Sequence, residues 1–108
     1  MSSDDGRPIT LAFVGYTTSA DAERAAAYED AVLPLLAEHG ARVLHRGRRR
    51  ADQHESLPFE VHVLWFPDRA AFDAYLADDR RAALLAQFGE TFTRKEVVEL
   101  DVIEGLGA

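Results

Sequence analysis

The stretch "LPFEVHVLWFPDRAAFDAY", residues 57–75, contains a complete predicted strand and the start of a helix. Alternate residues of a strand point to opposite faces of a sheet. One face of this strand is entirely hydrophobic: Phe59, Val61, Val63 and Trp65. The other face mixes hydrophobic with ionisable side chains: Glu60, His62, Leu64 and Phe66. A strand at the surface would have a cleanly polar second face, so we expect this strand to be covered on both sides.

Three further strands and two helical regions are predicted from the rest of the chain. Alternating side chains predict strands over residues 8–16, 41–50 and 93–105. Apolar residues at helical spacing predict helices over residues 18–40 and 68–89. The stretch between the second and third strands, "ADQHES", is polar and is expected to form a turn or loop.

Short signals mark the ends and breaks of the helices. Gly40 is expected to end the first helical region in a left-handed conformation. Pro34 removes one backbone hydrogen bond, which predicts either a kink or two short helices that meet at Leu33. Asp68 follows Pro67 and is expected to cap the second helical region, and a further capped segment can start near Asp78.

The order of these elements, βαββαβ, indicates an α+β domain with a ferredoxin-like fold. The commonest arrangement is a four-stranded antiparallel sheet with both helices on one face. Strands 8–16 and 57–66 are the most apolar and are expected to be central. The arginine-rich strand 41–50 suits an edge that must resist unwanted pairing. Residues 1–7 are predicted to be a disordered tail and residues 8–108 a single domain.

Helices on one face leave the other face of the sheet uncovered, which predicts a homodimer. The uncovered face is expected to hold Ala12, Val14, Tyr16, Glu60, His62, Leu64, Phe66, Glu99 and Asp101. This is more exposed apolar surface than a monomer usually carries, and sheet-on-sheet packing of two copies would bury it. Arg46 or Arg48 would then form an ion pair with Glu99 or Asp101 of the partner subunit.

Composition excludes several classes of protein. The formal charge of −7 argues against binding to nucleic acids or to anionic membranes. The chain has no cysteine, and its four histidines lack the H-x-x-x-H spacing of a metal site, so no metal is expected. No glycine-rich phosphate loop is found, and no cofactor is expected. The start of the chain lacks the features of a signal peptide, which predicts a cytoplasmic protein.

Two segments carry a family resemblance: "GARVLHRG", residues 40–47, and "VLWFPDRAAFDAYLADDRRAAL", residues 63–84. With them the chain resembles the dimeric α/β-barrel superfamily, in which two ferredoxin-like sheets pair into a barrel with the helices outside. It is most similar to an uncharacterised family of roughly hundred-residue proteins. The sequence departs from that family at Trp65, where an acidic residue usually precedes the Phe-Pro pair.

The resemblance implies a broad range of functions. Some members of the superfamily are cofactor-free monooxygenases, cyclases or isomerases that act on aromatic or polyketide-like small molecules. Others cleave haem, and others bind ligands or are associated with stress. Fold alone does not choose among these functions.

His62 and Tyr16 are the candidate catalytic residues. His62 lies in the middle of a predicted central strand and can act as a base or orient a substrate carbonyl. The alternative for His62 is a hydrogen-bonded residue inside the dimer interface. His45 is expected either to face the helices and a pocket or to lie near solvent on its edge strand. The other candidate substrate-binding residues are aromatic and can equally form the core: Tyr28, Trp65, Phe72 and Tyr75.

Two functional hypotheses follow. The first is a homodimeric enzyme that acts without a cofactor on a hydrophobic, aromatic or polyketide-like metabolite. The second is a non-catalytic ligand-binding or stress-associated protein whose ionisable residues serve the dimer. A deep pocket between sheet and helices, with a histidine or tyrosine facing into it, would favour the first hypothesis.

Overall fold

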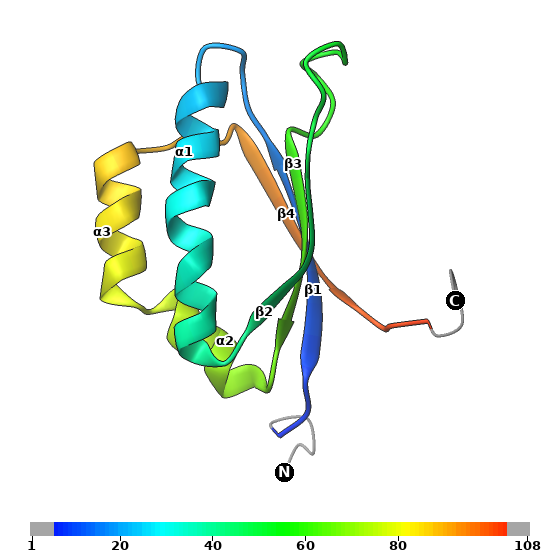
Figure 1. Ribbon diagram of the computed structural model, residues 1–108, viewed down its shortest axis with the longest axis vertical. Helices are drawn as coiled ribbons and strands as arrows, with labels where there is room; N and C mark the ends of the chain where they lie inside the picture. The colour runs from blue at the N-terminus through cyan, green and yellow to red at the C-terminus, as the bar shows by residue number, and fades with distance from the viewer. Residues whose placement is uncertain (1–5, 104–108) are drawn as a thin grey trace.

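The structure is a computed structural model, and it describes residues 6–103. The elements follow one another as β1 (Ile9–Tyr16), α1 (Ala22–Val32), η1 (Leu33–His39), β2 (Arg42–Arg48), β3 (Glu60–Phe66), α2 (Arg69–Leu76), α3 (Asp79–Phe88) and β4 (Arg94–Leu100) (Figure 1). Most of the predicted N-terminal tail and the end of the predicted last strand, residues 1–5 and 104–105, lie outside the described residues.

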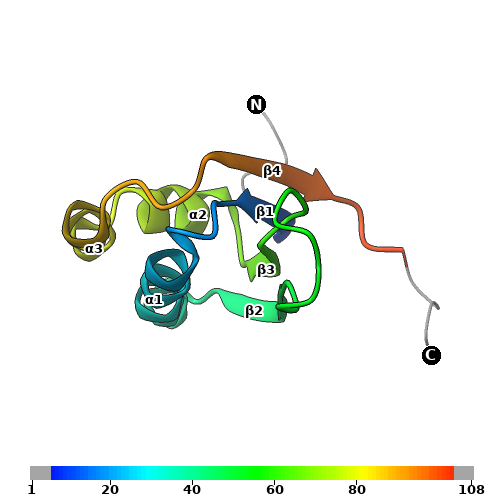
Figure 2. The same ribbon diagram turned by 90° about the horizontal axis from the view of Figure 1, so that it is seen from above.

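The four strands form one antiparallel sheet in the order β2-β3-β1-β4. All of the labelled helices lie on the same side of this sheet (Figure 2). The predicted ferredoxin-like α+β fold is therefore confirmed, with β1 and β3 at the centre and the arginine-rich β2 at an edge. Among the described residues, no helix is both long and apolar enough to cross a membrane. The cytoplasmic location stays a prediction.

The residues predicted to end or interrupt the helices do so in the structure. Helix α1 ends at Val32, and the 3₁₀ helix η1 begins at Leu33 with Pro34 in its first turn, as in the two-helix alternative. Gly40 follows η1 with a φ of 70°, the left-handed conformation that glycine adopts at little cost. The Asp68 side chain accepts a hydrogen bond from the amide of Ala71 and caps α2. The Asp78 side chain caps α3 in the same way.

The two faces of β3 are reversed relative to the prediction. Glu60, His62, Leu64 and Phe66 are buried and face the helices, whereas Val61, Val63 and Trp65 lie on the open face. The antiparallel register explains this, because it places Leu64 opposite Leu11 and His62 opposite Phe13 on the helix side of the sheet. The prediction for β1 was correct, since Ala12 and Val14 lie opposite Val63 and Val61 on the open face.

The hydrophobic core lies between the sheet and the helices. Its members come from every layer: Leu11, Ala25, Tyr28, Val32, Leu33, Leu36, Ala41, Phe59, Leu64, Phe66, Tyr75 and Phe92. Phe66, the last residue of β3, is fully buried and contacts the rings of Phe72 and Tyr75 on α2. The same layer contains charged groups of β3, and these define the candidate site.

Candidate functional site

A cavity of about 190 Å³ lies between the helix side of the sheet and the helices. Its polar lining comprises Tyr28, Glu29, His62, Tyr75, Arg81, Glu90, Thr91 and Lys95. Its apolar lining includes Leu11, Phe13, Val32, Leu64, Phe72, Leu85, Phe92 and Val97. An apolar concavity with a few converging polar groups is the usual form of a small-molecule site.

Four of the predicted site residues meet at this cavity, namely Tyr28, His62, Phe72 and Tyr75. They come from α1, β3 and α2, so the fold brings together residues that are far apart in the sequence. The sequence pattern predicted all four as candidate site residues. Burial raises the pKa of the Tyr75 hydroxyl to about 12. It also raises the pKa of Tyr28, so both hydroxyls stay protonated at neutral pH and can donate hydrogen bonds.

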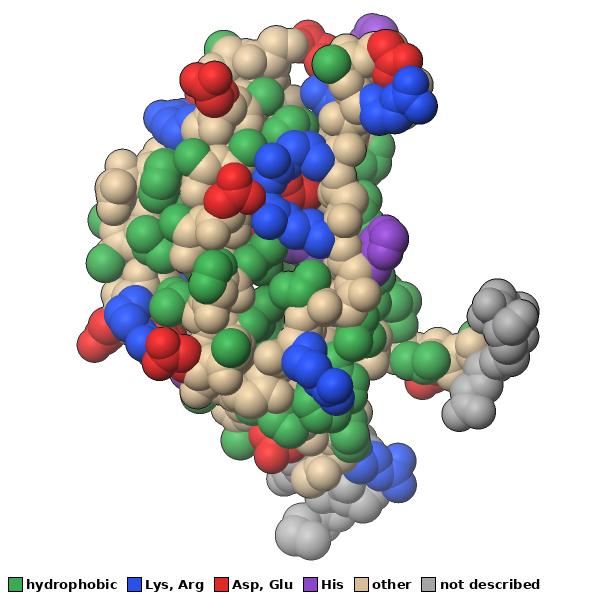
Figure 3. All heavy atoms as spheres, in the orientation of Figure 1, with side chains coloured by type: hydrophobic (Ala, Val, Ile, Leu, Met, Phe, Trp, Pro, Cys, Tyr) green, Lys and Arg blue, Asp and Glu red, His purple; other side chains and the backbone are tan. Residues whose placement is uncertain are grey.

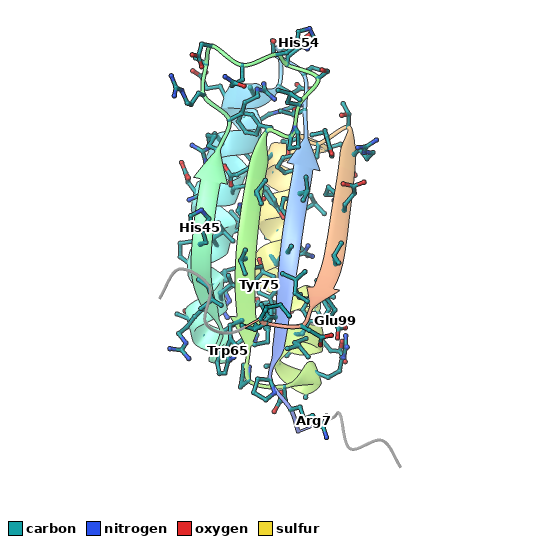
Figure 4. The ribbon with its side chains drawn as sticks, turned by 90° about the vertical axis from the view of Figure 1, so that its right-hand side faces the viewer. Arg7, His45, His54, Trp65, Tyr75 and Glu99 are labelled. Carbon is teal, nitrogen blue, oxygen red and sulfur yellow. The ribbon has the colours of Figure 1, made fainter. Side chains whose placement is uncertain are left out.

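The structure places the other three predicted residues elsewhere. His45 lies opposite Val63 on the open face and does not face the helices, because the β2–β3 register shifts between Val43 and His45 (Figure 4). Trp65 is also on the open face, where the Arg42 guanidinium lies 4.5 Å from its ring centroid. Tyr16 is at the end of β1, with Arg94 stacked 4.1 Å from its ring centroid and away from the cavity.

His62 is held in one orientation by its neighbours. Its Nε2 lies 2.5 Å from Oε1 of Glu60, two residues earlier on the same face of β3. Its ring stacks on Phe13 with centroids 5.0 Å apart. A neutral ring that donates its Nε2–H to the Glu60 carboxylate carries its lone pair on Nδ1. This location excludes the alternative in which His62 lies within a sheet-on-sheet interface.

Glu60 is fully buried but receives several charge-assisted hydrogen bonds. Nε of Arg46 lies 3.1 Å from its Oε1, and Nε of Arg48 lies 2.5 Å from its Oε2. Burial raises the pKa of Glu60, but the hydrogen bonds from His62, Arg46 and Arg48 outweigh it and lower that pKa below its ordinary value. Glu60 is therefore a carboxylate at neutral pH.

The partners of Arg46 and Arg48 differ from those predicted. Besides Glu60, both guanidinium groups contact Oδ1 of Asp30 on α1, at 2.7 and 3.2 Å. These charges form the cluster of blue and red side chains between α1 and β2 in Figure 3. Glu99, proposed as a partner across the dimer, instead pairs with Arg69 of the same chain. The arginines thus neutralise the glutamate that the fold buries, which is why the mixed face of β3 can lie under the helices.

Glu29 is a second buried acid at the cavity, and the sequence interpretation missed it. Burial, the largest effect, raises its pKa from 4.5 to about 7, and the electrostatic interaction with His62 opposes this rise. Oε1 of Glu29 lies 3.9 Å from Nε2 of His62. Glu29 lies on the same buried stripe of α1 as Ala25 and Val32. This helical spacing is the sequence signal that could have predicted its burial.

Glu29→Gln is expected to change how stability depends on pH. A carboxyl whose folded pKa is raised stabilises the fold below its unfolded pKa, near 4.5, and loses that contribution as the pH rises towards about 7. The wild type should therefore lose on the order of 3 kcal/mol relative to Glu29→Gln across this window. Urea unfolding of both proteins at several pH values measures the difference. Parallel pH profiles would show that Glu29 ionises normally.

Glu29, Glu60 and His62 also form the kind of group that can hold a metal ion, since one ligand atom from each lies within 4.8 Å of the others. These three residues are nevertheless poorly suited to binding a metal ion. Both oxygens of Glu60 already accept hydrogen bonds from guanidinium groups, which a metal ion would have to displace. A buried site with two adjacent arginines is better suited to holding a proton than a divalent ion. The absence of a metal cofactor stays a prediction.

The order of the elements and of the strands makes this chain a ferredoxin-like α+β protein. Residues 12–102 match the family described as Domain of unknown function (DUF1330), and the chain belongs to this family. A search of curated proteins finds no significant match.

Several solved structures share the fold at low sequence identity. A protein of unknown function from Rhodopseudomonas palustris is 18% identical with a TM-score of 0.69, covering 95% of this chain and 88% of its own. A putative antibiotic biosynthesis monooxygenase from Bacteriodes thetaiotaomicron is 11% identical with a TM-score of 0.72, covering 90% of each chain. A mutant of SnoaB, a cofactor-independent oxygenase from Streptomyces nogalater, is 16% identical with a TM-score of 0.63, covering 94% of this chain and 98% of its own. At these identities the similarity establishes the fold alone.

Proposed function

We propose that the cavity binds a hydrophobic, aromatic or polyketide-like metabolite and that His62 removes a proton from it without a cofactor. The observation that carries this proposal is the arrangement of His62, which lines the cavity while the ionised Glu60 orients its ring. A base held by a second group is the arrangement that general base catalysis requires. Two of the fold relatives, an oxygenase and a putative monooxygenase, support this class of chemistry.

The proposed step can be written at the level of atoms. A C–H or O–H bond of the substrate breaks, the proton passes to Nδ1 of His62, and the electron pair stays on the substrate as an enolate or phenolate. Glu60 stabilises the imidazolium that forms, because its carboxylate already contacts Nε2. Isomerases, cyclases and cofactor-free monooxygenases can all begin from such an anion. Which of these reactions follows depends on the metabolite.

The test is proton exchange at an activated carbon. In D₂O, the wild-type protein is expected to accelerate deuterium incorporation into 2-tetralone, a bicyclic aromatic ketone, as followed by NMR. His62→Gln should lower this acceleration by about 10²-fold, the usual effect of losing a general base. His45→Gln is the matched control, because His45 lies on the opposite face of the sheet and should leave the rate unchanged. An equal rate for wild type and His62→Gln would contradict the proposal.

A second candidate function is non-catalytic binding, which the ion network favours. Glu60 and His62 are paired within the chain, so their charges are explained without any reaction. In that case a small aromatic molecule would bind the cavity of wild type and of His62→Gln alike. Binding of 2-tetralone without accelerated exchange would select this function.

We further propose that the protein is a homodimer formed by packing two open faces together. This face carries large apolar side chains that remain accessible, including Val61, Val98 and Leu100 at 37, 50 and 40% exposure. Figure 4 views the sheet from this side, with every helix behind it. Val102 and Ile103 follow β4 and are also exposed. Accessible apolar side chains on a sheet face without helices are typical of a surface that a second copy covers.

A further inference from the structure

Arg81 of α3 lines the cavity and has an unused hydrogen-bond donor. Its Nε is buried, and it has no acceptor among residues 6–103. Buried N–H groups are nearly always paired, so a buried charged donor beside a cavity indicates that a ligand supplies the acceptor.

The side chain of Arg81 is held in place by an aromatic ring. Its guanidinium lies 5.4 Å from the ring centroid of Tyr75, within the range of a cation–π contact. Stacking of this kind orders the guanidinium, while its buried Nε stays without an acceptor among residues 6–103. Arg81 is therefore an ordered donor and not a freely moving surface side chain.

The positive charge of Arg81 acts on the other polar groups of the cavity. It opposes the effect of burial on the pKa of Tyr28, Glu29 and Tyr75. Lys95 adds a second cation to the lining, and Glu90 adds an acid. Glu29 is largely protonated below its pKa of about 7, so at slightly acidic pH the net charge of the lining favours an anion.

We propose that Arg81 binds a negatively charged oxygen of the ligand, which selects flat apolar molecules carrying one carboxylate, phenolate or enolate. The proposal rests on the proposed function, because it concerns the same cavity and the enolate or phenolate that His62 would produce. A guanidinium that accepts the developing charge lowers the energy of this anion relative to the neutral substrate. Arg81 is then a specificity-determining residue, and His62 acts on the proton.

Two probes of similar size and shape but different charge test whether the cavity prefers an anion. The first is 2-naphthoate, which is an anion at pH 6, and the second is the neutral 2-naphthalenemethanol. Isothermal titration calorimetry at pH 6 is expected to show that the wild type binds the anion at least about tenfold more tightly. One charge-assisted hydrogen bond is sufficient for this preference.

Three variants test whether Arg81 causes the preference for the anionic probe. Arg81→Met keeps the aliphatic length and should abolish the preference while still binding 2-naphthalenemethanol. Arg81→Lys keeps the charge without the fixed donor and should lose most of the preference. Arg50→Met is the matched control, because it removes the same charge from an exposed residue outside the cavity and should behave as wild type. A melting curve of each variant confirms that the fold is retained.

The possible failures are distinguishable. If both probes bind the wild type equally, or if Arg81→Met and Arg81→Lys keep the preference, the role of Arg81 is overturned while cavity binding stands. If neither probe binds the wild type, ligand binding in the cavity is overturned and the inference fails with it. Weaker binding of both probes to Arg81→Met would assign Arg81 a packing role and would also overturn the proposal.

Discussion

Glu60→Leu is expected to lower the free energy of unfolding by about 3–5 kcal/mol, because it removes the anion from a buried ionic network. Glu60 is fully buried and contacts Arg46, Arg48 and His62. Leucine fills a similar volume, so the loss comes from cations left without their carboxylate and not from a cavity. In a domain of this size the melting temperature should fall by at least about 12 °C. Thermal and urea unfolding measure the change.

Asp30→Asn is the control for this experiment. Asp30 contacts the same two guanidinium groups, but its side chain is 58% exposed. Exposed ion pairs contribute up to about 1 kcal/mol, so this variant should be nearly as stable as the wild type. A triple variant with Glu60→Leu, Arg46→Met and Arg48→Met removes both signs of charge and should recover part of the loss. If Glu60→Leu were no less stable than Asp30→Asn, the network would not stabilise the fold.

Val98→Asp is expected to convert the proposed dimer into a monomer. Val98 is 50% exposed on the open face of β4, opposite Ala12 of β1. In a symmetric dimer the substitution would bury two carboxylates in an apolar interface, each at a cost of several kcal/mol. The dissociation constant should therefore rise by about 10³-fold or more. Light scattering coupled to size-exclusion chromatography reports the mass directly.

Leu57→Asp provides the comparison for the dimer test. Leu57 is 44% exposed, but it lies in the loop before β3 and outside the sheet face. It should leave the mass unchanged. A wild-type monomer at micromolar concentration would refute the dimer, as would a dimer that survives Val98→Asp. Leu64→Asp cannot serve this purpose, although the sequence suggested Leu64 as an interface residue, because Leu64 belongs to the core beneath the helices.

The elements and their order could be predicted because their signals are local. Pro34 separates α1 from η1, Gly40 ends η1, and Asp68 and Asp78 cap the helices that follow them. Each of these residues acts through its own backbone or through atoms within one turn. The alternation of β1 and β3 then leaves few topologies for a chain of this length, and the ferredoxin-like sheet follows.

Only the tertiary structure decided which face of β3 is buried under the helices. A strand has a period of two, so the alternation separates its faces without saying which one the helices cover. Leu64 and Phe66 suit either environment, and residue type alone favours an interface over a core for Glu60 and His62. The buried position of Glu60 depends on Arg46 and Arg48, which reach it from a neighbouring strand.

The same distinction holds for the candidate site: local sequence patterns predict some of its residues, and long-range contacts decide the others. The sequence by itself determined that Tyr28, Phe72 and Tyr75 lie on apolar helix faces, and these faces line the cavity. It could not determine that Glu29 and Arg81 join them, because charged residues on helices usually face solvent and their burial depends on what packs against them. Local chemistry thus determined the elements, and the packing of distant segments decided which ionisable groups share one cavity.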